Sequence, residues 1–151
     1  RFDCAHHVLQ ADATAAAATL PEIDFAYLDP PYNQHPYGSN YFMLNLLLRY
    51  KQPEQASRVS GIPADWHRSP YNKRSEVQQA LDSLLTTLPA RFVLISYNSE
   101  GFVPLEAMQN LLARHGKVQL MQTDYATFRG CRNLRSRALS VKEYLFLLEK
   151  K

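Results

Sequence analysis

Four consecutive residues, Asp29-Pro30-Pro31-Tyr32, combine groups that suit chemistry on an amino group. The exocyclic amino group of a nucleobase is a poor nucleophile because its lone pair is delocalised into the ring. The Asp29 carboxylate and the Pro30 carbonyl oxygen can accept its two N–H groups and so localise the lone pair on nitrogen. Pro30 and Pro31 restrict the backbone, which holds both acceptors in place before a base arrives. Tyr32 adds a ring that can stack on an extruded base. We therefore assign these four residues to a candidate catalytic site.

A second candidate segment, residues 126–140, concentrates positive charge. Between Asp124 and Glu143 there is no acidic residue, but five basic residues occur there: Arg129, Arg132, Arg135, Arg137 and Lys142. The formal net charge of the chain is +3, and it would be −1 without the four arginines. Such a local excess favours contact with a polyanion. A solvated basic loop is the alternative.

Apolar runs of strand length precede the polar residues that could do chemistry. Residues 23–28 (IDFAYL) end at Asp29, and residues 91–97 (RFVLISY) end at Asn98. Nearly continuous apolar runs are typical of strands buried on both faces of a parallel sheet. Asp29 and Asn98 therefore fall at the carboxyl ends of neighbouring predicted strands, where ligands bind in open α/β sheets.

The rest of the chain alternates between helical and extended patterns. Apolar spacing predicts helices over residues 13–20, 40–50, 75–88 and 103–115, and further strands over residues 4–10, 117–125 and 141–149. The candidate caps are Asp12 or Thr14, Ser39 or Asn40, and Ser75, with Gly116 as a helix stop. Residues 51–74 contain several prolines and predict a long irregular excursion.

This order of elements predicts an α/β fold with a mostly parallel sheet and helices on its faces. The last two strands are separated only by the basic segment, which leaves no room for a helical crossover. We therefore expect that pair to be antiparallel.

The motifs, taken in order, resemble the Dam-like, alpha-class family of adenine-N6 DNA methyltransferases, whose target-base motif is DPPY. The resemblance lies in YLDPPYNQHPYGSNY, ISYNSEGF, DYATFRGCRNLRSR and KEYLFLLEK, and spans roughly residues 8 to 150. It is strongest toward restriction-modification and phage-borne relatives. It implies a Rossmann-like methyltransferase sheet, S-adenosylmethionine as cofactor and double-stranded DNA as partner.

The resemblance also assigns roles to individual residues. Asp12, after Leu9-Gln10-Ala11, matches an acidic residue that contacts the adenosyl part of the cofactor, and Asp29 belongs to the same cofactor site. Asp12 as a simple helix cap is an equal alternative. The resemblance assigns nucleic-acid contacts to the end of the second predicted strand and to the basic segment, at Tyr97, Asn98, Phe128, Arg129, Arg132, Arg135 and Arg137. Tyr97 and Asn98 as plain turn residues are again the alternative.

One feature of the family is missing from this sequence. Its members hold the methionine end of the cofactor on a glycine-rich FxGxG turn that precedes DPPY. The five glycines here, at positions 38, 61, 101, 116 and 130, provide no such spacing. We therefore expect residues 1–151 to be the C-terminal part of a class I methyltransferase catalytic domain. The N-terminal strands would be missing, and a further segment or a second chain would complete the cofactor site. Alone, the chain is not expected to turn over.

Composition excludes several other classes of protein. The two cysteines, Cys4 and Cys131, match no metal-ligand spacing and no disulfide framework, and the histidines are assigned to no metal. No apolar run approaches the roughly 18 residues of a membrane span. A reduced, cytoplasmic setting is the default expectation.

Two alternative functions stay open at this point. The same chemistry could act on an amino group of RNA or on cytosine N4, which analysis of methylated nucleosides would separate. A non-catalytic nucleic-acid-binding domain that keeps the fold is the other. The missing glycine turn favours it and the intact DPPY motif argues against it.

Overall fold

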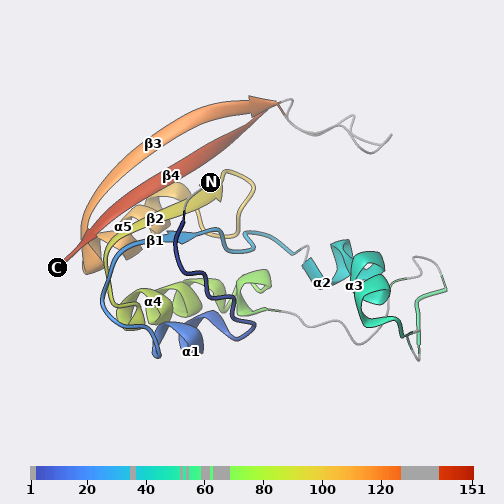
Figure 1. Ribbon diagram of the computed structural model, residues 1–151. Coiled ribbons are helices and arrows are strands. Elements are labelled where there is room, and N and C mark those ends of the chain that lie inside the picture. Colours follow the sequence, from blue (N-terminus) through green and yellow to red (C-terminus); the bar gives the residue numbers. More distant parts are fainter. Residues whose placement is uncertain are drawn as a thin grey trace.

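The computed structural model describes residues 3–34, 37–51, 53, 55–58, 62, 69–126 and 140–151. Within these ranges the chain is a mixed α/β structure (Figure 1). The strands are β1 (Ile23–Leu28), β2 (Ala90–Asn98), β3 (Gly116–Ala126) and β4 (Ser140–Lys150). The helices are α1 (Ala13–Ala17), α2 (Tyr37–Asn40), α3 (Phe42–Arg49), α4 (Val77–Thr87) and α5 (Leu105–His115), with a 3-10 turn η1 (Pro70–Asn72).

The four strands form one sheet in the order β1-β2-β4-β3. β1 and β2 are parallel, while β4 lies between β2 and β3 and is antiparallel to both. Three strands therefore share one direction, which confirms the antiparallel last strand. β1 and β2 are neighbours, with Leu28 opposite Ile95, so both strands bring their carboxyl ends to the same edge of the sheet.

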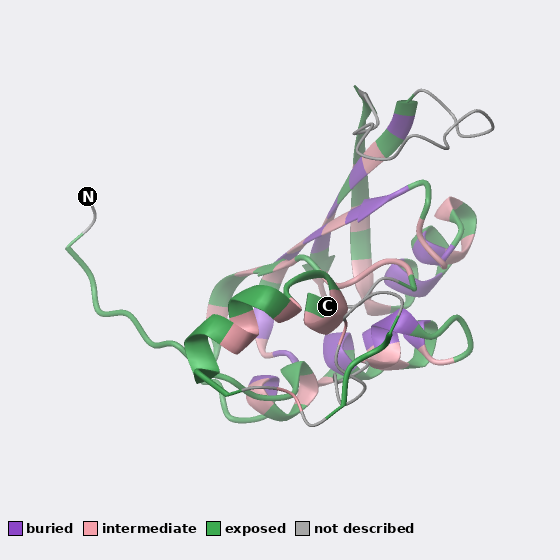
Figure 2. Ribbon diagram, turned by 90° about the vertical axis from the view of Figure 1, so that its right-hand side faces the viewer, coloured by how far each residue is buried: buried purple, intermediate pink, exposed green. Residues whose placement is uncertain are grey.

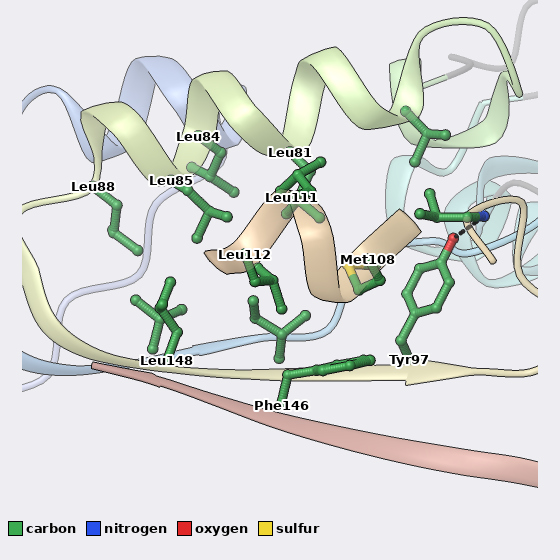
Figure 3. Packing of buried hydrophobic residues seen from close by; sticks show 14 of the residues in the cluster. Leu81, Leu84, Leu85, Leu88, Tyr97, Met108, Leu111, Leu112, Phe146 and Leu148 are labelled. Carbon is green, nitrogen blue, oxygen red and sulfur yellow. Dashed lines mark hydrogen bonds between the residues drawn. The ribbon is translucent and has the colours of Figure 1, made fainter. Parts of the chain in front are cut away.

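The hydrophobic core fills the space between one face of the sheet and helices α4 and α5 (Figure 3). Helix α4 contributes Leu81 and Leu85, α5 contributes Met108 and Leu112, and Phe146 rises from β4; each is at most 1% exposed. Burying one such side chain stabilises a fold by about 1.5–3 kcal/mol. The regular spacing of leucines in residues 75–88 and 103–115 is thus explained, and both predicted helices are confirmed.

The opposite face of the sheet is apolar but uncovered in the described part of the chain. Phe25 and Tyr27 on β1 are 53% and 56% exposed, and Met121 on β3 is 49% exposed. The far edge of β1 also has no partner strand in the described ranges. The sequence predicts helices on both faces, whereas α4 and α5 pack on one face only.

The strand predicted over residues 4–10 is wrong. Residues 3–10 have no regular structure and are exposed, with Val8 96% accessible to solvent. Figure 2 shows this segment as a tail leading away from the folded body. A strand needs a partner that accepts and donates its backbone hydrogen bonds, and none of the described strands lies beside this tail.

Two predicted caps are also wrong, although their helices exist. Residues 39 and 40 lie inside α2, and α3 follows Tyr41 without a side-chain cap. Helix α4 begins after Glu76, so Ser75 is not its cap. Asp12, by contrast, caps α1, and Gly116 ends α5 as predicted. Backbone geometry at helix starts is set by the preceding turn, which residue type alone does not determine.

Helices α2 and α3 project from the side of the sheet domain (Figure 1). The apolar side chains of α3 are largely exposed, with Leu47 at 69% and Leu48 at 85%. No helix in the described ranges is long and apolar enough to cross a lipid bilayer.

Lys150 links the end of β4 to the end of α4. Its ammonium group donates to the carbonyl oxygens of Leu85, at 2.6 Å, and Leu88. Burial lowers the pKa of Lys150. A cation at a helix C-terminus also complements the helix dipole, so this contact fixes α4 against the sheet.

Candidate active site

Asp29 lies immediately after β1, at the carboxyl edge of the sheet. Its side chain is exposed, and its carboxylate makes no hydrogen bond or ion pair with any described residue. The adjacent Pro30 is half-buried, and the same ranges supply no donor to its carbonyl oxygen. Two acceptors from neighbouring residues are therefore open to a ligand, while β1 fixes the backbone that carries them.

The turn that follows is held by the loop after β2. The backbone N–H of Phe102 donates to the Tyr32 carbonyl oxygen at 2.8 Å. The Tyr97 hydroxyl donates to the same oxygen at 3.4 Å. The rings of Tyr32 and Tyr97 also meet edge to face, with centroids 5.9 Å apart. Burial, followed by the charges of Glu143 and Asp29 among nearby groups, raises the pKa of Tyr32. These contacts fix the end of the Asp29–Tyr32 motif.

Tyr97 and Asn98 occupy the buried end of β2. Tyr97 is 2% exposed, and its hydroxyl accepts the backbone N–H of Val103 at 3.2 Å (Figure 3). Asn98 is 4% exposed, and its side-chain oxygen accepts the backbone N–H of Glu100 at 3.0 Å. Burial raises the pKa of Tyr97, while backbone hydrogen bonds oppose that rise. In this arrangement both side chains shape the loop beside the motif.

Gly101 allows that loop to close over Tyr97. A Cβ atom at Gly101 would lie 2.2 Å from Cε1 of the Tyr97 ring, far inside van der Waals contact. The Arg74 guanidinium covers the next residue, Phe102, with 5.1 Å between Cζ and the ring centroid. The loop is therefore packed from both sides, which keeps the Phe102 N–H aimed at the motif.

Sequence reasoning missed Asn72. This residue ends η1, is 5% exposed, and donates from Nδ2 to the carbonyl oxygen of Asn33 at 2.8 Å. Asn33 directly follows the Asp29–Tyr32 motif. Asn72 lies in the segment that the sequence predicts to be irregular, and no motif marks it. A hydrogen bond from a side chain to a distant backbone carbonyl leaves no pattern that sequence reasoning could use.

Sequence reasoning also missed an aromatic pair, one ring in α2 and the other directly after it. Tyr37 and Tyr41 have ring centroids 5.8 Å apart and are 49% and 52% exposed. Burial, and then the charge of Asp29, raises the pKa of Tyr37, so this ring lies within electrostatic reach of the motif. Two accessible, neighbouring rings suit contact with flat ligands.

Asp12 lies at the start of α1. Its Oδ1 accepts the backbone N–H groups of Thr14 and Ala15, both at 3.0 Å. Asp12 therefore caps α1, which is one of the two roles that the sequence offers for it. Oδ2 has no hydrogen-bond partner in the described ranges, so one acceptor oxygen is left at an exposed position.

The basic segment lies outside the described residues, and so do its candidate contacts Phe128, Arg129, Arg132, Arg135 and Arg137. The strands on either side of it are described. Asn98 at the end of β2 pairs with Glu143, and β4 extends past that point to Ser140, which pairs with Ala126. The segment therefore connects two strand ends beyond the carboxyl edge of β2, on the side of the sheet where Asp29 lies.

The described residues contain no group of three or more His, Cys, Asp or Glu side chains placed to hold a metal ion. No solved structure is significantly similar to the chain.

Residues 2–111 match the family described as D12 class N6 adenine-specific DNA methyltransferase. The matched region includes β1, β2, the Asp29–Tyr32 motif, Asn72 and the first part of α5, up to Leu111.

Individual relatives are similar over most of this chain. Type II methyltransferase M.NlaIII of Neisseria lactamica is 34% identical over 147 residues, which is 96% of this chain and 43% of the relative. Type II methyltransferase M.CviAII of Paramecium bursaria Chlorella virus 1 is 34% identical over 125 residues, 83% of this chain and 37% of the relative. Type II methyltransferase M.FokI of Planomicrobium okeanokoites is 30% identical over 128 residues, 84% of this chain and 20% of the relative. The chain thus spans less than half the length of these relatives.

Proposed function

The chain belongs to the D12 class of N6 adenine-specific DNA methyltransferases, and we propose that the protein carrying it transfers a methyl group from S-adenosylmethionine to the N6 amino group of adenine in double-stranded DNA. The names of its relatives, type II methyltransferases and a modification methylase, support a role in a restriction-modification or phage system. The sheet would be part of a larger Rossmann-like sheet of the class I methyltransferases. Among the described residues, the far edge of β1 has no partner strand and one apolar face of the sheet is uncovered, which supports this.

The observation that carries the proposal is the open carboxylate of Asp29. A surface carboxylate at the carboxyl end of β1, with no described partner, lies next to a turn that several hydrogen bonds hold rigid. Preorganised acceptors stabilise developing charge without reorganising during the reaction. Asp29 and the Pro30 carbonyl would accept the two N–H groups of adenine, which localises the lone pair on N6.

The other residues of the motif would hold the base in place. Tyr32, half-buried against Tyr97, would present its ring to a base extruded from the duplex. Pro31 keeps the turn between acceptor and ring short and stiff. N6 would carry positive charge as it accepts the methyl group, whose bond to the cofactor sulfur breaks at the same time. The Asp29 carboxylate would stabilise that charge, and one N6 proton would then pass to that carboxylate or to solvent.

The residues present fit one part of the cofactor. Bound S-adenosylmethionine would supply an electrophilic methyl group. The free Oδ2 of Asp12 and the carboxylate of Asp29 offer acceptors for the hydroxyl and amino groups of its adenosyl part. No FxGxG turn occurs among the glycines of this sequence, so the methionine end would be bound by a further segment or a second chain.

Duplex DNA would contact the carboxyl edge of the sheet. The basic segment with Phe128, Arg129, Arg132, Arg135 and Arg137 begins and ends at this edge, beyond the last pairs of β2 with β4. Arginines bind phosphates and so position a duplex without reading its sequence. Tyr97 and Asn98 would act near the base through the loop that they shape.

The test is product analysis with the full-length protein. It is incubated with duplex DNA and S-adenosylmethionine carrying a labelled methyl group, and the DNA is then digested to nucleosides and separated. Label in N6-methyl-2′-deoxyadenosine is the expected result. Label in N4-methyl-2′-deoxycytidine, label only when RNA replaces DNA, or no transfer at all would each overturn the proposal.

A further inference from the structure

Asn72 is one of two buried polar residues in the described part of the chain, the other being Asn98 at the end of β2. It is 5% exposed, compared with 4% for Asn98. Burying an amide without partners costs free energy, so a buried asparagine is stable only when its groups are bonded. Asn72 meets that need through Nδ2, which donates to the Asn33 carbonyl oxygen at 2.8 Å.

The element that carries Asn72 is itself anchored. Ser69 caps η1 by accepting the backbone N–H of Tyr71 at 3.3 Å, and Pro70 fixes its first turn. Tyr71 is 8% exposed, its hydroxyl donates to the Ala80 carbonyl oxygen of α4 at 3.4 Å, and burial raises its pKa to about 12. The Asn72 amide is thus attached to the helix layer of the core.

The carbonyl groups of Tyr32 and Asn33 are consecutive, and each accepts hydrogen bonds from a different part of the fold. The preceding carbonyl, that of Tyr32, accepts the backbone N–H of Phe102 from the loop after β2 and the hydroxyl of Tyr97 from β2 itself. Asn72 comes from a separate element, η1, which lies 39 residues beyond Asn33 in the chain. The start of the turn is fixed by β1, so the motif is held from the sheet, from the β2 loop and from α4 through η1.

We propose that Asn72 is a positioning residue for methyl transfer: by holding the Asn33 carbonyl it fixes the turn in which Asp29, Pro30 and Tyr32 meet the target adenine. This inference rests on the proposed function. Asn72 touches neither base nor cofactor and acts through the backbone of the turn. Its effect should therefore fall on the chemical step, because a displacement of about 1 Å at a reacting group can cost about a hundredfold in rate.

The experiment uses the full-length protein and three variants of Asn72. Asn72→Asp keeps the shape but removes the donor and turns an acceptor toward the Asn33 carbonyl. Asn72→Leu removes the polar group and keeps the volume, and Asn72→Gln keeps a donor on a longer side chain. Single-turnover rates are measured at saturating DNA and cofactor, with KM for DNA and the melting temperature alongside.

The expected result is a split between rate and binding. Asn72→Asp and Asn72→Leu should lower the rate of methyl transfer about tenfold to a hundredfold, with KM for DNA changed less than about threefold. Asn72→Gln should recover part of the rate. Should Asn72→Asp not fold, the comparison of Asn72→Leu with Asn72→Gln decides the matter.

Two controls separate positioning from stability. Asn110→Asp makes the same chemical change on the exposed face of α5 and should leave rate and melting temperature unchanged. Leu112→Ala opens the core, where Leu112 is 0% exposed, and should lower the melting temperature while preserving the rate at a permissive temperature.

The outcomes separate a failure of the positioning role from a failure of the proposed function. If wild type transfers methyl groups and all three Asn72 variants keep rates within about twofold, Asn72 is structural only and the inference is overturned alone. A wild-type protein without adenine methylation would overturn both. A rate loss matched by Leu112→Ala at the same melting temperature would also overturn the positioning role.

Discussion

The hydroxyl of Tyr97 donates to the carbonyl oxygen of Tyr32, which lies 65 residues earlier in the chain, across 3.4 Å. The contact joins the ends of β1 and β2 after their last paired residues. It also explains why a tyrosine occupies a position that is 2% exposed, since its hydroxyl is used twice, as donor to Tyr32 and as acceptor from Val103. The five predictions that follow concern this region and the surfaces around it.

Asp29→Ala in the full-length protein should abolish methyl transfer and leave the fold intact. The substitution removes one acceptor of the amino group, and losing one preorganised polar contact typically lowers turnover about a hundredfold or more. Because Asp29 is exposed, the melting temperature should hardly change. Turnover is measured by label transfer, with the exposed Asp24→Ala on β1 as matched control. Near-normal turnover of Asp29→Ala would falsify the assigned role.

Replacing Arg129, Arg132, Arg135 and Arg137 together with alanine should flatten the salt dependence of DNA binding. Each phosphate contact contributes about 0.9 to the slope of log K against log salt on duplex DNA. Fluorescence anisotropy at several salt concentrations measures the slope. The exposed Arg91 and Lys117, at the opposite ends of their strands, provide a control double variant that should keep the wild-type slope. An unchanged slope in the quadruple variant would mean that the segment is only solvated.

The isolated 151-residue chain should bind S-adenosylmethionine weakly or not at all, and it should associate with itself or a partner. The sequence places the unpaired edge around residues 4–10, but in the described part of the chain the sheet ends at β3 on one side and, on the other, at the open edge of β1. That edge borders the exposed rings of Phe25 and Tyr27, and open apolar edges promote pairing between chains.

Light scattering and calorimetry test both parts of this prediction. Phe25→Lys with Tyr27→Lys places charges on the open face and should shift the chain toward monomer. A micromolar dissociation constant for the cofactor, or a wild-type monomer with a cooperative melt, would contradict the prediction.

Gly101→Ala should destabilise the chain through the Tyr97 ring. The new methyl carbon would lie 2.2 Å from Cε1 of a ring that is 2% exposed, so ring or loop must move. Overpacking of this kind costs about 1–3 kcal/mol. Thermal or denaturant unfolding measures the loss. In a Tyr97→Leu background, which removes the ring, the same substitution should cost clearly less; equal costs in the two backgrounds would show that the clash is not the cause.

Tyr37→Ala and Tyr41→Ala should weaken the binding of DNA to the full-length protein. Both rings are half-exposed and pack against each other, and stacking of a ring on a base is worth about 1–3 kcal/mol. The dissociation constant, and the fluorescence of 2-aminopurine at the target base, report the change. Tyr50→Ala removes a ring that is 96% exposed on the same projecting unit and is the matched control. Equal effects of all three substitutions would argue against a specific role for the pair.

The strands around the site were predictable because their signals are local. Residues 23–28 form β1 with the bounds expected, and residues 91–97 lie within β2, since apolar runs ended by polar or proline residues specify strands. The expected burial on both faces is wrong for β1 in the described part of the chain, because no described element covers Phe25 and Tyr27. Residues 4–10 have a comparable mixture of residue types but no strand beside them. Strand formation there depends on a partner that local sequence does not describe.

The supports of the site were not predictable, for a related reason. Asn72 and Tyr97 hold backbone carbonyls of residues 33 and 32, and a backbone carbonyl is the same at every position of a sequence. Neither the spacing between partners nor the choice of asparagine reveals such a bond. Motif residues such as Asp29 could be recognised from their types, whereas the residues that aim them become visible only in three dimensions.

The position of β4 has a consequence for synthesis of the protein. It is the last of the four strands along the chain, yet it lies inside the sheet between β2 and β3. While the ribosome is still translating the segments before residue 140, β2 has only β1 beside it, and β3 has no neighbour among these strands. The nascent chain must therefore wait, with apolar strands open to chaperones, until residues 140–150 leave the exit tunnel and close the gap in a single late step.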